Sequence, residues 1–252
     1  QDATRKLNNA IRARVPLIVI NSPERTRILE LINGIATSFR SRKTANGQAI
    51  RMDLYQWTLG RGITQLDGMT PVIPDWLKKT TPAGTTLAQM SVNPDAALRI
   101  ISDRVVETRG VAATEQARGR SVVDESANSI WIMHDMGAFF NGAQPNPAVI
   151  AALRECATTT FLLQSMILVG PDHNIPASLP DVTIIDWPLP SAEEVEEVVN
   201  QAIANKPASA VDASKDDPTL VGKIVQAAKG LPREDISLQL AQIIVDQRGI
   251  TQ

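Results

Sequence analysis

The acidic residue with the clearest chemical setting is Asp135, which directly follows the apolar run 129–134. Nucleotide-hydrolysing α/β enzymes hold magnesium with an aspartate at the end of such a buried strand. The next residue is Met136, where many of these enzymes carry the glutamate that activates water. Half of that motif is present. Asp135 is therefore interpreted either as a residual metal ligand or, the favoured reading, as a strand-end aspartate of a relic site.

A phosphate-binding loop is missing after the first apolar run, residues 16–21. In P-loop proteins the first strand leads into a glycine-rich loop whose N–H groups and lysine hold the phosphates. Here Ser22-Pro23-Glu24 follows, without glycine and without a Lys-Ser/Thr pair; Pro23 removes an N–H and Glu24 places a carboxylate where the anion would sit. We expect no triphosphate binding in the usual mode, no catalytic residue, and a relic nucleotide site of Ser22, Glu24 and Asp135.

The histidines and the single cysteine allow other chemistry. Asp135 and His134 are the residues that a metal-dependent hydrolase would use, which stays open as an alternative and requires a metal at the carboxyl ends of the strands. Structural roles are favoured for His134 and His173, and a buried thiol is expected for Cys156 on the apolar side of a predicted helix. One cysteine excludes an internal disulfide and fits a reducing, cytoplasmic compartment.

Composition narrows the class of protein further. Hydrophobic residues make up 43% and charged residues 21% of the 252 residues, as in soluble globular proteins. The net charge of −2 argues against nucleic acid or anionic membranes as the main partner. No apolar stretch approaches the ~18 residues that span a bilayer, so no membrane association is expected. The chain starts at Gln1 without Met, and we expect it to be part of a longer or processed protein.

Short apolar runs alternate with amphipathic helical stretches, which is typical of a parallel sheet with crossover helices. Five strands are predicted, at 16–21, 49–55, 129–134, 166–169 and 182–185. The second alternates as an edge strand would. Helices are predicted after Ser22, Asn93 and Asn146, each of which is followed by a proline at the first helical position. Residues 56–92 predict a long loop or a hairpin insertion, and 110–127 a polar loop.

The pattern becomes wholly helical after Trp187-Pro-Leu-Pro190. Ser191 and Glu194 have the spacing of a capping box, which predicts a helix start. A linker over 206–216 and two further helices follow. We therefore expect an α/β domain over 1–190 and a small helical lid over 191–252.

Several stretches stand in an order that resembles the N-terminal region of AAA ATPases of the type found in cyanobacteria and plastids. They are residues 11–20, 130–136, 146–155, 166–171, 175–179 and 184–190. In that family the region is a degenerate AAA-like domain that precedes a second module with the working ATP site. The sequence stops near Gln252, about where that module is expected to begin.

The resemblance implies a five-stranded parallel sheet of P-loop NTPase (AAA) type with a small C-terminal helical lid. It implies no cofactor for this domain, but ATP and Mg²⁺ for the parent protein, and other AAA subunits as partners in a homo-oligomer. Arg154 is a candidate trans-acting arginine, although such a residue more often covers surface with its stem. The segments 56–92 and 110–127 are candidate contacts for a protein partner. A protein- or DNA-binding module stays open as a further alternative.

Overall fold

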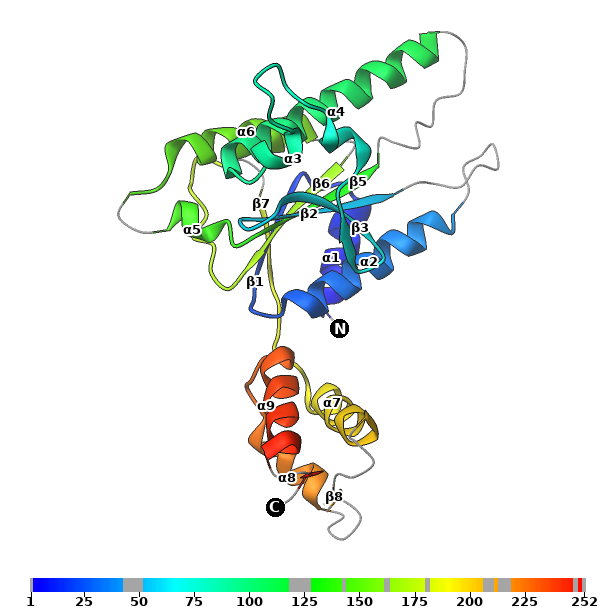
Figure 1. Ribbon diagram of the computed structural model, residues 1–252, viewed down its shortest axis with the longest axis vertical. Helices are drawn as coiled ribbons and strands as arrows, with labels where there is room; N and C mark the ends of the chain where they lie inside the picture. The colour runs from blue at the N-terminus through cyan, green and yellow to red at the C-terminus, as the bar shows by residue number, and fades with distance from the viewer. Residues whose placement is uncertain are drawn as a thin grey trace. The chain divides into compact units, whose positions relative to one another are not determined.

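The computed structural model describes residues 2–42, 52–117, 128–141, 144–160, 164–179, 182–205, 211–212, 219–246 and 249–250 (Figure 1). The chain divides into unit 1, Gln1–Trp187, and unit 2, Pro188–Gln252. In these described segments no helix has both the length and the apolar character that crossing a membrane requires.

Unit 1 is built on a seven-stranded mixed sheet with the order β4-β3-β2-β5-β6-β1-β7. The strands are β1 Leu17–Asn21, β2 Asp53–Thr58, β3 Gly62–Asp67, β4 Thr70–Val72, β5 Ser129–His134, β6 Gln164–Gly170 and β7 Val182–Asp186. Strands β2, β5, β6, β1 and β7 are parallel neighbours, and β3 and β4 extend the sheet as antiparallel strands. The predicted count of five strands is therefore wrong, because the segment 56–92 contributes two more.

The position of β2 also differs from the prediction. It lies between β3 and β5 and is almost wholly buried, so its alternating pattern does not mark an edge strand. The segment after β4 contains the short helices η1 Asp75–Lys78 and α3 Leu87–Met90. Ser91, directly after α3, accepts a hydrogen bond from Trp57 Nε1 (2.6 Å) at its carbonyl and from the Ile63 N–H (2.9 Å) at its hydroxyl. These bonds tie the inserted segment to the hairpin.

Helices cover both faces of this sheet (Figure 1). The helices of unit 1 are α1 Asp2–Arg12, α2 Arg25–Arg40, α4 Pro94–Ala117, α5 Gly137–Phe140 and α6 Pro147–Thr160, besides α3. Alternate residues of β1 enter two separate cores: Ile18 and Ile20 pack with α1 and α2, and Leu17 and Val19 with α4 and α6. Such double burial explains why β1 reads as a continuous apolar run.

The predicted helix starts at Asn93 and Asn146 are confirmed. The Asn93 Oδ1 accepts from the Asp95 N–H, and the Asn146 Oδ1 accepts from the Ala148 N–H. Helix α4 continues to Ala117, so the predicted polar loop over 110–127 is wrong for its first eight residues. Residues 118–127 lie outside the described part of the chain, as do residues 49–51 of the predicted second strand.

The described part of unit 2 contains three helices and a pair of two-residue strands. Its elements are α7 Ala192–Asn205, β8 Val211–Asp212, α8 Leu220–Ala227, α9 Arg233–Asp246 and β9 Gly249–Ile250. The capping box is confirmed, because the Ser191 N–H donates to Glu194 Oε2 and the Glu194 N–H to Ser191 Oγ. Six buried residues form the core: Val195, Val198, Val199, Ala228, Ile236 and Leu240. That this unit acts as a lid stays a prediction, as does the boundary at 190.

The contact between Gly62 and Ser91 gives a test of how the insertion is held. Gly62 has φ +68°, and a Cβ there would overlap the Ser91 hydroxyl and lie 2.9 Å from the Val92 nitrogen. We expect Gly62→Ala to lower the free energy of unfolding by about 3 kcal/mol, through backbone strain and overpacking. Gly68→Ala is the matched control, since Gly68 has φ +63° but open space around it. It should cost only about 1 kcal/mol in urea unfolding; equal losses would contradict the packing argument.

Candidate functional site

The candidate site lies at the edge of the sheet where β1, β5 and β6 end. Asn21 is paired in register with Gly170, and His134 with Val169. Ligands of open α/β sheets bind at this carboxyl edge. The sequence-predicted residues Ser22, Glu24 and Asp135 all follow these strands, so the sheet brings the three together at one edge.

The turn from β1 to α2 is closed by its own hydrogen bonds. The Ser22 N–H donates to Gly170 O (2.7 Å), and the Glu24 N–H donates to Ser22 Oγ (3.1 Å). Helix α2 begins at Arg25, two residues later than predicted, and Glu24 has the non-helical angles φ −75° and ψ 53°. The reason is that the Ser22 hydroxyl bonds the N–H two residues on, which forms a side-chain turn before the helix.

Glu24 is a buried acid beside a cation. Its side chain is 1% exposed, and its Oε2 lies 3.6 Å from Nη1 of Arg27. The Arg27 guanidinium also lies over the Trp187 ring, 5.8 Å from its centroid. A carboxylate removed from water needs such a partner, because an unpaired buried charge costs several kcal/mol. The position that a phosphate would need is thus next to a fixed negative charge.

Asp135 is paired with a residue that the sequence analysis did not select, Arg25. The Arg25 Nη2 lies 2.6 Å from Asp135 Oδ1, and the two side chains are 44% and 43% exposed. An ion pair this open to solvent contributes at most about 1 kcal/mol, so its main effect is on the charge of the site. The sequence did offer one indication of this partner, because Arg25 is a basic residue at the start of the helix after the first strand.

The backbone of Asp135 lies close to Gly170 of the neighbouring strand β6. Asp135 has φ +57°, in the left-handed region, and its N–H donates to Val169 O (2.9 Å). A Cβ on Gly170 would lie 3.1 Å from Asp135 Oδ1 and 3.3 Å from Asp135 Cα. Aspartate tolerates this conformation better than most residues. The glycine leaves room for the aspartate next to β6.

His134 is buried at the end of β5 and is 4% exposed. Among the residues that the structure describes, neither ring nitrogen has a hydrogen-bond partner. Burial, and then the charge of Arg25, lower the pKa of His134 to about 4, against a smaller opposite effect of Asp135. The ring is therefore neutral at pH 7.

His173 is held by Asn21. The Asn21 Oδ1 accepts the backbone N–H of His173 (3.0 Å) and lies 3.0 Å from its Nδ1. Because a carbonyl oxygen only accepts, this amide orientation places the ring proton on Nδ1. Burial lowers the pKa of His173 as well. Within the described ranges no group of three or more His, Cys, Asp or Glu side chains is placed to hold a metal ion. The structural roles of the two histidines and the metal-dependent hydrolase stay predictions.

The remaining candidates lie away from this edge. Arg154 is exposed on α6, a helix that packs on the sheet through Leu153, Cys156 and Ala157. The structure does not bring Arg154 to Ser22, Glu24 and Asp135, and a trans-acting role stays a prediction. Cys156 is fully buried, and its burial raises the pKa of the thiol far above the ordinary value.

Fold and site together define an α/β domain with a mixed, mostly parallel sheet, in which a turn closed by Ser22 follows the first strand. Residues 3–187 match the family described as SpoVK-like AAA ATPase, N-terminal domain, and the chain belongs to this family. This confirms the AAA resemblance; the cyanobacterial or plastid type stays a prediction. No curated protein matched the sequence.

Three solved structures resemble the chain in fold. They are the FIGL-1 AAA domain in complex with ADP (8% identity, TM-score 0.42, 92% of this chain), the HORMA:CdnC:Trip13 complex of E. coli MS115-1 (11%, 0.41, 96%) and the Hsp104:casein complex of S. cerevisiae (12%, 0.47, 99%). This chain spans 61%, 87% and 39% of the matched chains, respectively.

The buried, neutral His134 predicts a pH dependence of stability. Its folded pKa of about 4 lies below the unfolded value of about 6.5, so unfolding takes up a proton. The free energy of unfolding should therefore fall as the pH drops from about 6.5 to about 4, by at most about 3 kcal/mol from this residue. Urea unfolding of the wild type and of His134→Leu across this range measures the effect. The free energy of unfolding of the wild type minus that of His134→Leu should rise with pH and level off above about 6.5; a constant difference would contradict the assignment.

Proposed function

We propose that this chain is a catalytically degenerate N-terminal domain of an AAA ATPase that acts in oligomer assembly or partner recognition. ATP and Mg²⁺ are then bound and hydrolysed by a following module of the parent protein. The observation that carries the proposal is the turn after β1, whose N–H groups are bonded within the chain instead of forming a phosphate loop; the 2.6 Å ion pair between Arg25 and Asp135 lies next to it.

The backbone donors of this turn support the proposal. In a phosphate loop the N–H groups after the first strand point at the anion. Here Ser22 donates to Gly170 O, Glu24 to Ser22 Oγ and Arg25 to Pro23 O, and Pro23 has no N–H. A phosphate at this place would have to break these bonds.

The charges support it too. A nucleotide triphosphate brings several negative charges, and Glu24 adds a buried carboxylate beside them. Asp135 would be the ligand for magnesium, but it already has Arg25 as its cation. A bound metal would displace Arg25 and lose this pair, although the pair itself is worth only about 1 kcal/mol. The loss of the glycine-rich loop is therefore the larger obstacle.

A role in assembly rests on what the domain retains. Two cores are complete without a ligand. Within 56–92 the large apolar side chains of Leu59, Met69, Val72 and Ile73 are exposed, as a protein-contacting surface requires. The proposal includes other AAA subunits as partners, Arg154 as a candidate contact in trans, a cyanobacterial or plastid-type parent and a cytoplasmic location. The net charge of −2 does not favour nucleic acid.

Calorimetric titration of this chain with ATP and Mg²⁺ tests the degenerate site. We expect no binding in the micromolar range, for the wild type and for Arg25→Ala, because freeing Asp135 does not restore the missing donors. The matched control is Asp135→Asn, which removes the candidate metal ligand and keeps the backbone conformation. Micromolar binding by the wild type that Asp135→Asn weakens would overturn the proposal.

In the parent protein, hydrolysis should depend on the following module. We expect Asp135→Asn to change the rate of ATP hydrolysis less than about twofold, and substitution of the lysine in a G-x-x-x-x-G-K-[ST] segment to abolish it. A loss of hydrolysis in Asp135→Asn, with the melting temperature of the protein unchanged, would assign catalysis to this domain instead.

A further inference from the structure

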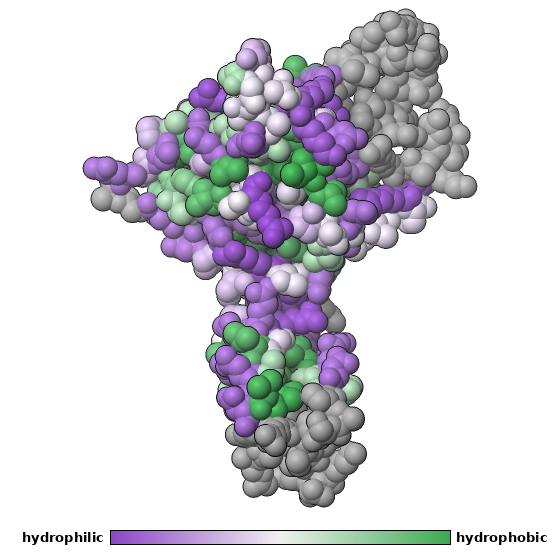
Figure 2. Space-filling model, viewed as in Figure 1, coloured by the Kyte–Doolittle hydropathy of each residue, from purple (hydrophilic) through white to green (hydrophobic). Residues whose placement is uncertain are grey.

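Helix α9 of unit 2 has an exposed surface without charge. None of the ten residues between Asp235 and Asp246 is charged, although unit 2 contains ten acidic and six basic residues. Three large apolar side chains in this stretch are exposed: Leu238 to 59%, Val245 to 75% and Ile243 to 38%. Hydrophobic residues gather over α9 in the view of Figure 2. Depletion of charge together with exposed apolar area is typical of the centre of a protein interface.

The two most exposed of these side chains share one face of the helix. Leu238, Ala241 and Val245 have the spacing i, i+3, i+7, which places them in one line, the α9 stripe. Ile236 and Leu240 of the same helix enter the core of unit 2 instead. The α9 stripe is therefore not used by the unit's own packing.

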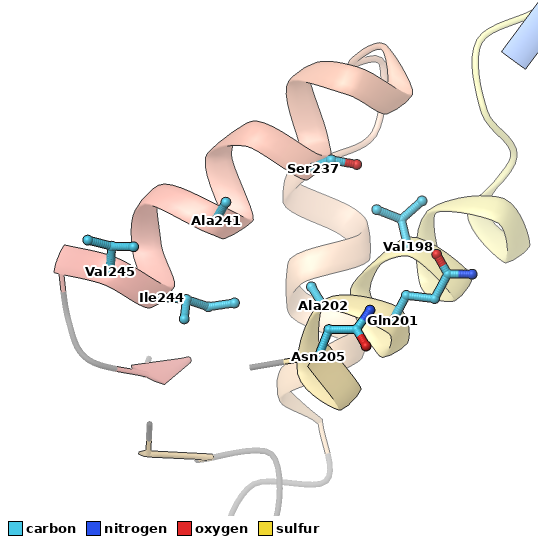
Figure 3. Close-up of a pocket in the computed structure, with 8 residues that line it drawn as sticks. All are labelled: Val198, Gln201, Ala202, Asn205, Ser237, Ala241, Ile244 and Val245. Atoms are coloured by element: carbon cyan, nitrogen blue, oxygen red, sulfur yellow. The ribbon is translucent and has the colours of Figure 1, made fainter. Parts of the chain in front are cut away.

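An apolar groove lies beside the α9 stripe, between α7 and α9 (Figure 3). It has a volume of about 380 Å³. Eight residues line it: Val198, Gln201, Ala202, Asn205, Ser237, Ala241, Ile244 and Val245. Within the described part of unit 2 none of these lining residues is charged. Ala202 and Ala241 keep the groove open, because their small side chains do not fill the space between the helices.

We propose that a second copy of this chain binds here, with its α9 lying antiparallel against the α9 stripe around a two-fold axis midway between Leu238 and Val245, next to Ala241. A two-fold interface uses the same surface on both copies, so residues at equal distances from the axis meet. Leu238 then faces Val245 of the partner subunit, and the small Ala241 at the crossing lets the two backbones approach closely.

The charge pattern favours a second copy over a charged partner. An uncharged face against itself leaves no charge buried without a counter-ion, whereas a basic or acidic helix would leave its own charges unpaired. Antiparallel packing also sets the positive end of each helix dipole beside the negative end of the other. The 14-residue helix is about 21 Å long, so this contact alone is smaller than the ~800 Å² per partner of a standard interface. The dimer should be weak and should depend on concentration.

Sedimentation equilibrium of the full chain over a range of concentrations tests the proposal. We expect a monomer–dimer equilibrium in the wild type. Leu238→Lys and Val245→Glu should each weaken it at least about tenfold, because each buries a charge in an apolar contact. The double variant should restore dimerisation, since Lys at 238 then meets Glu at 245 across both halves of the two-fold contact. Gln239→Lys, on the same helix outside the α9 stripe, is the matched control and should leave dimerisation unchanged.

Several results would overturn this inference. They are a chain that stays monomeric at the highest soluble concentration, association that neither single variant weakens, and single variants that weaken association without restoration in the double variant. The last result would point to a different, non-symmetric contact of the same face. Because both side chains are exposed, circular dichroism should show unchanged helix content in all variants; should one variant unfold, the other single variant still decides the result.

Discussion

The parallel pairing of β1 with β6 is the interaction on which the site depends. It brings Asn21 level with Gly170, and the Ser22 N–H then continues the ladder with one further bond to Gly170 O. On the other side of β6, the same register places His134 beside Val169 and leaves Asp135 next to Gly170. A residue with a side chain at position 170 would crowd Asp135. One pairing thus sets the position of every group at this edge.

The charges of the edge are matched within the chain. Arg25 faces Asp135 across the end of the sheet, and Arg27 accompanies the buried Glu24. The two pairs contribute differently to the free energy of unfolding. The half-exposed pair of Arg25 and Asp135 contributes little, whereas removing the cation beside the buried Glu24 would lower that free energy strongly. The two cores of the sheet are built from apolar side chains of its own strands and helices.

The strands buried on both faces were predictable from the sequence. A short, continuous apolar run between two amphipathic helices is typical of a buried parallel strand. The predictions at β1, β5, β6 and β7 agree with the structure to within two residues at each end. For 56–92 the sequence left a long loop and a hairpin insertion open, since β3 and β4 are short and Gly62 and Gly68 interrupt any periodicity; the structure has the hairpin. What holds it is long-range: the bonds from Trp57 and Ile63 to Ser91 join residues about thirty positions apart.

Two features of the candidate site could be read directly from the sequence. One is that neither glycine nor lysine follows β1, and the other is the aspartate after β5. The sequence by itself also determined the AAA resemblance, through short motifs in a fixed order. Only the tertiary structure decided the partner of Asp135, because Arg25 is 110 positions away and a strand-end carboxylate has no local signal for its cation. The same holds for the neutral state of His134, which follows from burial and from the charge of Arg25, a residue far from it in the chain. Spacing in a sequence reports neighbours along one element, whereas charge and burial depend on which elements the sheet brings together.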